Sequence, residues 1–408
     1  MLWAEKFSAH FFTDFIISWR IVRHTDSSFF RKILVISFFC VKMIENDMRW
    51  CFLLFANVID LEEITLQDLQ KIIDLAGEIK KSPAAYSESC RGKILATLFY
   101  EPSTRTQMSF QTAMMRLGGN TIGFDNPMNS SVAKGESLKD TIKIVSGYAD
   151  IIAMRHPLEG SARAASLYSS VPVINGGDGG HLHPTQTLTD LVTLYNEKGR
   201  LHDLCIGLCG DLKNGRTVHS FIKTMSHFRG NRFILVSTKE LGIPHYIKDA
   251  LHAAGCNYTE ITTLKEAIPL LDVLYMTRIQ RERFKNEAEY QKQRGVYILD
   301  TEKLSFAKKD LKILHPLPRV DEIAVEVDDD SRAIYFDQAV YGMYARMALI
   351  LLMLQAPSVQ KSETPASTHL HRCNNPRCIT STEPYLPYIF KDNGDMLICN
   401  YCENRMLI

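Results

Sequence analysis

The sequence predicts an α/β protein with two doubly wound parallel-sheet domains, followed by a small four-cysteine domain at the C-terminal end. The first observation is that short apolar runs alternate with longer amphipathic stretches, which is typical of a parallel sheet covered by helices on both faces. The second is a helical stretch that starts at a proline, residues 184–198, between two such alternating sets. The third is a cluster of four cysteines that follows a Pro/Ser/Thr-rich segment, residues 356–368.

Length and composition are those of an ordinary globular protein. A chain of 408 residues predicts about two or three domains, and 46% hydrophobic with 23% charged residues fits that class. The net charge of +1 gives no electrostatic argument for nucleic acid or an anionic membrane as a partner. Six of the ten cysteines are scattered, unlike a disulfide framework, so we expect a reducing, cytoplasmic location.

Residues 1–50 differ from the rest of the chain because they are rich in Phe, Ile and Trp. Their longest apolar run, residues 33–41, is far shorter than the roughly 20 residues that span a bilayer. A basic pair precedes this run as in a signal peptide, but no small-residue cleavage site follows. We expect an extension of unknown role, translated from an upstream start, with Met43 and Met48 as alternative starts.

The predicted elements of the first domain lie within residues 64–175. Residues 64–79 carry apolar side chains at helical spacing and predict an amphipathic helix. The apolar runs after it have the length of buried strands, and the stretches between them have the length of helices. The predicted strands are residues 94–100, 121–124, 151–154 and 171–175, and the predicted helices are residues 107–117, 137–148 and 160–169.

The second domain follows a helix over residues 184–198 that bridges the two sheets. Its predicted strands are residues 204–209, 232–236, 273–276 and 313–314, and its predicted helices are residues 217–227 and 245–254. A further helix is predicted at residues 345–354. The last helix has an apolar core face, and residues 356–368 behind it predict a linker because they lack apolar anchors.

Residues 101–106, Glu-Pro-Ser-Thr-Arg-Thr, lie where the first predicted strand ends and a helix begins. Backbone N–H groups at a helix start have no intrahelical partner, and the helix dipole favours an anion there. The hydroxyls of Ser103, Thr104 and Thr106, with the guanidinium of Arg105, complete a phosphate cradle. The segment has no Gly-rich run, so it is not a Walker loop. A capping cluster beside a surface arginine is the plainer interpretation of the hexapeptide alone.

Polar residues also follow the other predicted strands, at the sheet edge where open α/β proteins bind ligands. Each alone has an ordinary interpretation as a surface ion pair, a structural histidine or a glycine turn. Together they predict a substrate with several negative charges. No carboxylate pair, Ser/His/Asp set or Cys/His pair stands out among them, which favours catalysis by positioning and electrostatic stabilisation. The residues are Arg105, Arg155, Arg216 and Arg278, with Thr106, His183 and Gln186 beside them.

Residues 60–355 resemble the carbamoyltransferase family, motif by motif. Residues 102–106 with Ser109 and Phe110 resemble its carbamoyl-phosphate signature, and residues 130–136, 155–157, 183–186, 210–219, 276–280 and 315–319 match the aspartate branch in order. The ornithine branch carries a His-Cys-Leu-Pro motif where this chain has His-Pro-Leu-Pro at residues 315–318. The resemblance implies the carbamoyltransferase fold and the aspartate carbamoyltransferase reaction of de novo pyrimidine (UMP) biosynthesis, in which carbamoyl phosphate and L-aspartate give N-carbamoyl-L-aspartate and phosphate.

The resemblance also implies a role for each site residue and no cofactor for catalysis. The phosphate would be held by Ser103, Thr104, Arg105 and Thr106. The carbonyl would be polarised by Thr106, Arg155 and His183, and its amide held by Gln186 and the carbonyls of Pro316 and Leu317. The aspartate carboxylates would be held by Arg216, Arg278 and Gln280. A neighbouring subunit would supply Lys134, for both substrates, and Ser131 or Ser130, so the resemblance implies a homotrimer with shared active sites.

The C-terminal cysteines form two pairs separated by twenty residues, Cys373 with Cys378 and Cys399 with Cys402. This spacing predicts a closed, structural Zn²⁺ site, with a pair of disulfides as the alternative. His369 and His371 lie nearby and are not expected to be ligands. The segments resemble the zinc domain of the aspartate carbamoyltransferase regulatory chain. Because of this resemblance we expect assembly beyond the trimer through the zinc domain. Residues 356–408 leave no room for that chain's nucleotide-binding domain, so we expect no built-in nucleotide effector site.

The predicted domains are an extension at 1–50, a carbamoyl-phosphate-binding domain at 51–185 completed by a C-terminal helix at 336–355, an aspartate-binding domain at 186–335, a linker at 356–368 and a zinc-binding domain at 369–408. Two alternatives remain: a non-catalytic scaffold that assembles through the zinc domain, and a carbamoyltransferase for another amino acceptor. A zinc ribbon that binds nucleic acid is disfavoured, because Arg372, Arg377 and Arg405 make no marked basic patch.

Overall fold

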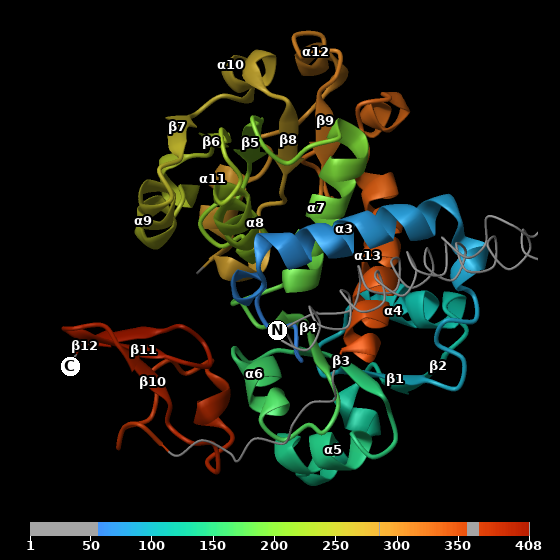
Figure 1. Ribbon diagram of the computed structural model, residues 1–408. Coiled ribbons are helices and arrows are strands. Elements are labelled where there is room, and N and C mark those ends of the chain that lie inside the picture. Colours follow the sequence, from blue (N-terminus) through green and yellow to red (C-terminus); the bar gives the residue numbers. More distant parts are fainter. Residues whose placement is uncertain (1–55, 285, 357–366, 408) are drawn as a thin grey trace, which may run out of the picture. The chain divides into compact units, whose positions relative to one another are not determined.

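The computed structural model describes residues 56–284, 286–356 and 367–407, and three sheets form within these residues (Figure 1). Two sheets are wholly parallel, and the third is small and antiparallel. This arrangement confirms the predicted fold class. Our expectations for residues 1–50, and for nearly all of the linker, lie outside the described residues. Within the described part of the chain, no helix is long and apolar enough to cross a bilayer.

The first sheet has four parallel strands in the order β2-β1-β3-β4. The strands are β1 (Ile94–Phe99), β2 (Asn120–Phe124), β3 (Ile151–His156) and β4 (Val173–Asp178). β1 is buried over nearly its whole length, as expected for a central parallel strand between two helical layers. α4 (Thr104–Arg116) packs against β1 and β2, whereas α6 (Ser161–Ser166) packs against β3, β4 and α5 (Leu138–Val145).

The second sheet has five parallel strands in the order β7-β6-β5-β8-β9. The strands are β5 (Cys205–Cys209), β6 (Arg232–Val236), β7 (Asn257–Ile261), β8 (Val273–Met276) and β9 (Lys312–Leu314), and the helices between them are α8 (Arg216–Ser226), α9 (His245–Ala253), α10 (Leu264–Ala267), α11 (Glu287–Gln293) and α12 (Thr301–Leu304). The chain leaves β5 for β6 on one side and later returns to β8 on the other. Ligands of open α/β sheets bind at such a switch point.

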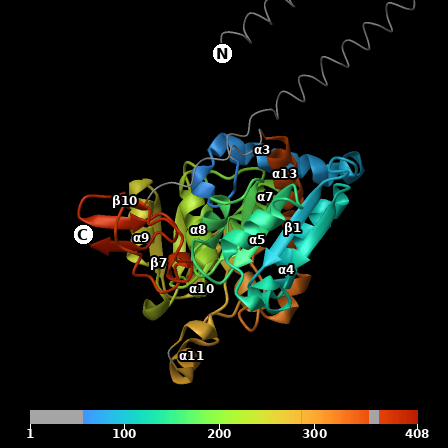
Figure 2. The same ribbon diagram turned by 90° about the horizontal axis from the view of Figure 1, so that it is seen from below.

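Three long helices connect the two sheets: α3 (Leu66–Lys81), α7 (Pro184–Lys198) and α13 (Tyr335–Gln355). α13 packs against both others and against α4, and α3 lies beside it in both views (Figures 1 and 2). Proline is the first residue of α7, and Gly199 ends it in a left-handed conformation, a position that glycine adopts without strain. The C-terminal half of α13 is buried all round, which explains why its sequence is almost wholly apolar.

The C-terminal domain contains the antiparallel strands β10 (Phe390–Asp392), β11 (Met396–Cys399) and β12 (Arg405–Leu407). Its core is continuous with that of the first sheet, since residues of α5 and α6 share one apolar cluster with the four cysteines, Leu386 and Phe390. The backbone of Glu159 in the first domain pairs with the C-terminal domain like a short strand. The Glu159 N–H donates to the Arg377 carbonyl over 2.8 Å, and the Glu159 carbonyl accepts from the Ile379 N–H over 2.9 Å.

Several element boundaries differ from the sequence predictions. α4 begins at Thr104 instead of residue 107, so three residues of the predicted phosphate loop form its first turn. β3 runs on through Arg155, and β4 runs on through Gly176 to Asp178, where the sequence predicted loops. β7 was not predicted, because its side chains are largely exposed and polar. α13 begins at Tyr335, ten residues before the apolar stretch predicted as a helix at 345–354 and one residue before the C-terminal helix at 336–355 of the predicted domains.

Candidate active site and metal site

A cavity of about 480 Å³ lies between the two parallel-sheet domains. Its walls come from the start of α4, the ends of β3 and β8, the starts of α7 and α8, the loop after β9 and one face of α13. Twelve of the site residues predicted from the sequence line it: Ser103, Thr104, Arg105, Thr106, Arg155, His183, Gln186, Arg216, Arg278, Gln280, Pro316 and Leu317. Segments more than 200 residues apart in the sequence thus meet at one site.

The start of α4 forms one wall of the cavity. Ser103 is the N-cap residue, yet its side chain makes no capping hydrogen bond to the helix. Instead its hydroxyl donates to the Thr106 hydroxyl over 3.1 Å. The backbone N–H groups of the first turn are therefore available to a ligand, at the positive end of a 13-residue helix. This geometry suits a phosphate group.

Arg155 reaches the cavity from β3 with only 11% of its side chain exposed. Its guanidinium forms an ion pair with Glu101 over 3.0 Å and donates to the Gly176 carbonyl over 3.3 Å. Burial lowers the pKa of Arg155, and the carboxylate of Glu101 acts in the opposite direction. The arginine is held in a fixed orientation before any substrate arrives, which suits a group that stabilises developing charge.

His183 is the last residue before α7 and is buried. Burial and the positive charges of Arg216, Arg155 and Arg346 lower its pKa well below the usual value. The imidazole is therefore neutral near pH 7. A neutral ring has one N–H to donate to a carbonyl oxygen and takes no proton from solvent at that pH.

Gln186, in the first turn of α7, is held by a fully buried carboxylate. Asp190 accepts hydrogen bonds from the Gln186 amide (2.8 Å), the Gln338 amide (2.6 Å) and the Tyr275 hydroxyl (3.1 Å). Burial raises the pKa of Asp190 to about 7, against the opposing effect of these three donors. Gln338 in turn accepts from the His315 N–H over 2.9 Å, so one network connects Gln186 with the 315–318 loop.

The second domain contributes cations to the opposite wall. Arg216 is the first residue of α8 and donates to the Gly179 carbonyl in the first domain. Burial lowers its pKa to about 10, which still leaves it positively charged at neutral pH. Arg278 and Gln280 follow β8, and the Gln280 N–H lies 3.5 Å from the Asp211 carboxylate. Two arginines and an amide of the second domain thus line the same cavity as the cradle at the start of α4.

Two predicted residues do not line this cavity. Ser131 and Lys134 lie in a short 3₁₀ segment (Ser131–Lys134), and both are exposed. The resemblance had assigned them to the active site of a neighbouring subunit, which a single chain does not test. Sequence reasoning also missed Arg346, whose guanidinium lines the cavity and donates to the Ser109 hydroxyl over 3.2 Å. The available signal was a lone arginine within the apolar run of α13.

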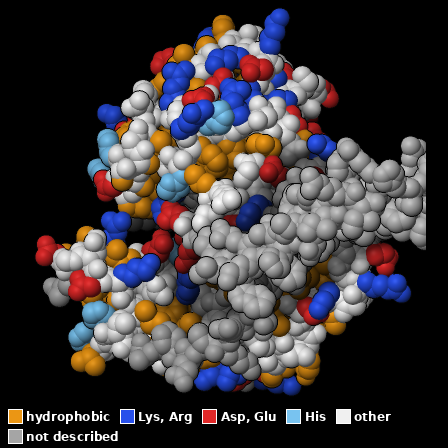
Figure 3. Space-filling view, viewed as in Figure 1, with side chains coloured by type: hydrophobic (Ala, Val, Ile, Leu, Met, Phe, Trp, Pro, Cys, Tyr) orange, Lys and Arg blue, Asp and Glu red, His pale blue; other side chains and the backbone are white. Residues whose placement is uncertain are grey.

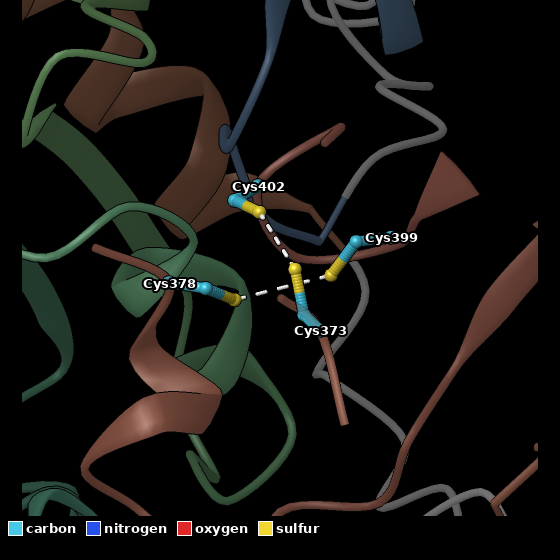
Figure 4. Close-up of side chains that lie close together, drawn as sticks. All are labelled: Cys373, Cys378, Cys399 and Cys402. Carbon is cyan, nitrogen blue, oxygen red and sulfur yellow. Dashed lines mark hydrogen bonds between the residues drawn. The ribbon is translucent and has the colours of Figure 1, made fainter. Parts of the chain in front are cut away.

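The four C-terminal cysteines converge as their spacing predicted (Figure 4). Their sulfur atoms all lie within 4.8 Å of one another, and all four residues are buried. The Cys373–Cys402 and Cys378–Cys399 sulfur distances are 3.7 and 3.9 Å, too long for disulfides and close to the roughly 3.8 Å edge of a tetrahedral zinc–thiolate site. The Thr380 hydroxyl donates to Cys378 over 3.2 Å, and the Asn375 N–H donates to Cys373 over 3.5 Å. These thiols can hold a metal ion, and no histidine joins the cluster in the described residues.

Comparison with protein families matches three parts of the chain. Residues 56–196 match the carbamoyl-P binding domain of aspartate/ornithine carbamoyltransferase, and residues 202–353 match its Asp/Orn binding domain. The chain belongs to the aspartate/ornithine carbamoyltransferase family. Residues 368–407 match the metal binding domain of the aspartate carbamoyltransferase regulatory chain. This family's catalytic domains and that metal binding domain therefore occur here in one chain.

Relatives place the chain within the family. The aspartate carbamoyltransferase catalytic subunit of Clostridium perfringens (strain SM101) is 58% identical over 299 residues, which are 73% of this chain and 97% of that protein. The same subunit of Clostridium botulinum (strain Eklund 17B) is 60% identical over the same shares. The catalytic subunit of M. jannaschii aspartate transcarbamoylase is similar in structure, with a TM-score of 0.69 and 47% identity over 73% of this chain and 97% of that one. The chain is thus an enzyme of the aspartate carbamoyltransferase branch.

Proposed function

We propose that the enzyme transfers the carbamoyl group of carbamoyl phosphate to L-aspartate in this cavity, as a step of de novo pyrimidine biosynthesis. The observation that carries the proposal is the placement of an anion cradle on α4 opposite two arginines of the second domain. A cavity with cationic groups on both walls suits two anionic substrates held side by side. Trypanosoma cruzi aspartate transcarbamoylase, 34% identical, has been solved with carbamoyl phosphate and aspartate, which supports the same pair of ligands here.

The phosphate of carbamoyl phosphate would be bound at the start of α4. Its oxygens would accept from the backbone N–H groups of the first turn, the hydroxyls of Ser103, Thr104 and Thr106, and the Arg105 guanidinium. Charge-assisted hydrogen bonds of this kind are about twice as strong as neutral ones. The same contacts would stabilise phosphate as it leaves with additional charge.

The carbamoyl group would lie between the cradle and α7. Arg155, Thr106 and the neutral His183 would donate to its carbonyl oxygen, while Gln186 and the carbonyls of Pro316 and Leu317 would hold its NH₂ group. The neutral aspartate amine would attack the carbonyl carbon, and the carbon–oxygen bond to phosphate would break with its electron pair. The proton lost from the amine nitrogen would pass to the departing phosphate, which offsets the negative charge that phosphate gains when the carbon–oxygen bond breaks. These donors are fixed before reaction, so they stabilise the oxyanion without reorganising.

L-Aspartate would be held by the second domain. Arg216, Arg278 and Gln280 supply two cations and an amide for its two carboxylates. An acceptor with a cationic side chain, such as ornithine, would meet like charges on this wall. This is the reason to prefer aspartate over another amino acceptor.

We further propose a homotrimer in which each cavity is completed by Ser131 and Lys134 of a neighbouring copy. Both residues are exposed and lie away from their own cavity. Exposed methionines, Met108 and Met115 on α4 and Met128 beside the 3₁₀ segment, are 60%, 57% and 71% exposed and give this region an apolar surface that another copy could cover. The predicted domain boundaries, including an aspartate-binding domain at 186–335, belong to the same proposal.

For the C-terminal domain we propose a structural Zn²⁺. Four thiolates at tetrahedral spacing, with N–H and O–H donors to sulfur, form a closed set of ligands that suits zinc. Cysteines kept as thiolates instead of disulfides would persist in a reducing compartment, which supports a cytoplasmic location. A domain of this size contains little core of its own and would need the metal to fold.

A colorimetric assay of carbamoyl-aspartate tests the proposal. We expect saturable formation of carbamoyl-aspartate with both substrates and none when either is omitted. The scaffold alternative requires that no product forms, and the other-acceptor alternative requires that another amine outcompetes aspartate.

A further inference from the structure

The C-terminal metal domain contacts both parallel-sheet domains through one side chain, Glu403. Its carboxylate lies 3.5 Å from the His181 ring nitrogen of the first domain and 3.8 Å from the Lys223 ammonium of the second. In Figure 3, acidic and basic side chains lie side by side where the C-terminal domain meets the rest of the described chain. Two further ion pairs lie near these contacts, Lys223 with Glu62 and Arg377 with Glu159.

On the first-domain side, the ion pair leads to the loop that ends at His183. His181 is hydrogen-bonded at its other nitrogen to the Asp178 carboxylate over 3.0 Å. Asp178 also accepts from the Leu182 N–H (3.0 Å) and from the N–H of Gly160, which precedes α6 (2.7 Å), so it closes the 178–182 turn and holds that turn against the start of α6. Burial acts to lower the pKa of His181, but the two carboxylates raise it to about 10, so the ring is a cation. Glu403 thus completes the charge balance of this turn.

On the second-domain side, the pair leads to the helix that begins at Arg216. Lys223 and Arg216 are seven residues apart on α8, which places them two turns apart on the same face. Arg216 donates to the Gly179 carbonyl, within the turn that His181 closes. The helix therefore contacts residues 179–181 directly at one end and through Glu403 at the other. Lys223 also lies 3.4 Å from Glu62, which precedes α3.

We propose that Glu403 is a positioning residue for aspartate binding, through which the metal domain sets the relation between the His183 turn and the Arg216 helix of its own chain. This inference rests on the proposed function, because the proposed function assigns aspartate binding to Arg216. It gives the fused metal domain a role within one chain, in addition to any role in contacts between subunits.

Other contacts of the same interface provide a matched control. Arg377 of the metal domain pairs with Glu159 over 3.2 Å, and Glu159 belongs to the first domain alone. Arg377→Gln removes one interface charge without touching the second domain. Comparing it with Glu403→Gln separates weaker docking from the loss of a bridge between domains.

The experiment measures kcat, the KM for aspartate and bound zinc for the full-length enzyme and for Glu403→Gln, Lys223→Gln, the double variant, Glu403→Asp and Arg377→Gln. We expect Glu403→Gln to raise the aspartate KM three- to tenfold with kcat within twofold and zinc content unchanged. The double variant should be less impaired than the sum of the two single variants, because both remove the Glu403–Lys223 pair, whereas the contacts of Glu403 with His181 and of Lys223 with Glu62 are lost separately. Glu403→Asp should recover part of the affinity, and Arg377→Gln should leave KM within twofold.

An unchanged aspartate KM in Glu403→Gln would overturn the inference, and so would an equal rise in Arg377→Gln or additive effects in the double variant. Variants that lose zinc are excluded as misfolded. Lys223→Gln, which lies outside the metal domain, then decides the question by comparison with Glu62→Gln, which removes the other partner of Lys223 and should leave KM within twofold. The wild-type rate tests the proposed function, whereas the ratio of variant to wild type tests this inference, so the two failures are distinguishable.

Discussion

Replacing Arg105 by alanine removes one cation from the first turn of α4, where the phosphate of carbamoyl phosphate is proposed to bind. The arginine is exposed at the mouth of the cavity, and alanine is a good helix former, so α4 should persist. Loss of one donor to a developing negative charge costs about 2.7–4 kcal/mol. At 1.36 kcal/mol per tenfold, kcat/KM should fall by about 10²–10³.

The matched control is Arg116→Ala, at the other end of the same helix and outside the cavity. It removes the same charge from an exposed site, so its kcat/KM should stay within twofold of wild type. Arg105→Lys should fall between the two, because an ammonium keeps the charge but loses the planar fork that matches phosphate. The assay is steady-state formation of carbamoyl-aspartate, with circular dichroism to verify the fold. Near-normal turnover in Arg105→Ala would refute the assignment of the cradle.

Three further predictions concern buried charge, assembly and metal. Since burial raises the pKa of Asp190 to about 7, above its unfolded value of about 3.9, the stability that it contributes is complete below about pH 4 and is lost as pH rises through 7. Between pH 5 and pH 8 this fall amounts to about 2.6 kcal/mol, and Asp190→Asn should remove it from the difference between the urea unfolding free energies at these two pH values. An identical pH dependence in both proteins would contradict this. Arg105→Ala and Lys134→Ala subunits, mixed in equal amounts, dissociated and reassociated, should regain about one quarter of wild-type activity if sites are shared in a homotrimer. Half of the cavities then have an intact Arg105, and half of those have a neighbour with an intact Lys134. No recovery would argue for self-contained sites. Withdrawing zinc with a thiol reagent and chelator should make residues 367–407 protease-sensitive while carbamoyl phosphate still binds, and full protease resistance after verified metal loss would contradict a structural zinc.

The sequence predicted most strands and helices because burial and backbone geometry coincide in them. Residues 232–236, 273–276 and 184–198 have the bounds of β6, β8 and α7, since an apolar run or an initiating proline marks each one. β7 was missed because it lies at the edge of its sheet, and most of its side chains are exposed and polar. The strands of the metal domain were also missed, because cysteine spacing indicates ligands and carries no strand periodicity.

The candidate site could be predicted to the extent that its residues follow strands or begin helices. Twelve predicted residues line one cavity for that reason. Arg346 and Asp190 were not predicted, because each lies inside a helix and its importance comes from the side chains that surround it in space. Glu403 was not singled out either, since neither His181 nor Lys223 is close to it in sequence.

The most direct test of the account supplies the purified chain with carbamoyl phosphate and either L-aspartate or L-ornithine, and measures the carbamoylated product of each. The cationic wall formed by Arg216 and Arg278 predicts saturable carbamoyl-aspartate formation and no product from ornithine above the uncatalysed background. Absence of carbamoyl-aspartate, or a preference for ornithine, would contradict the account.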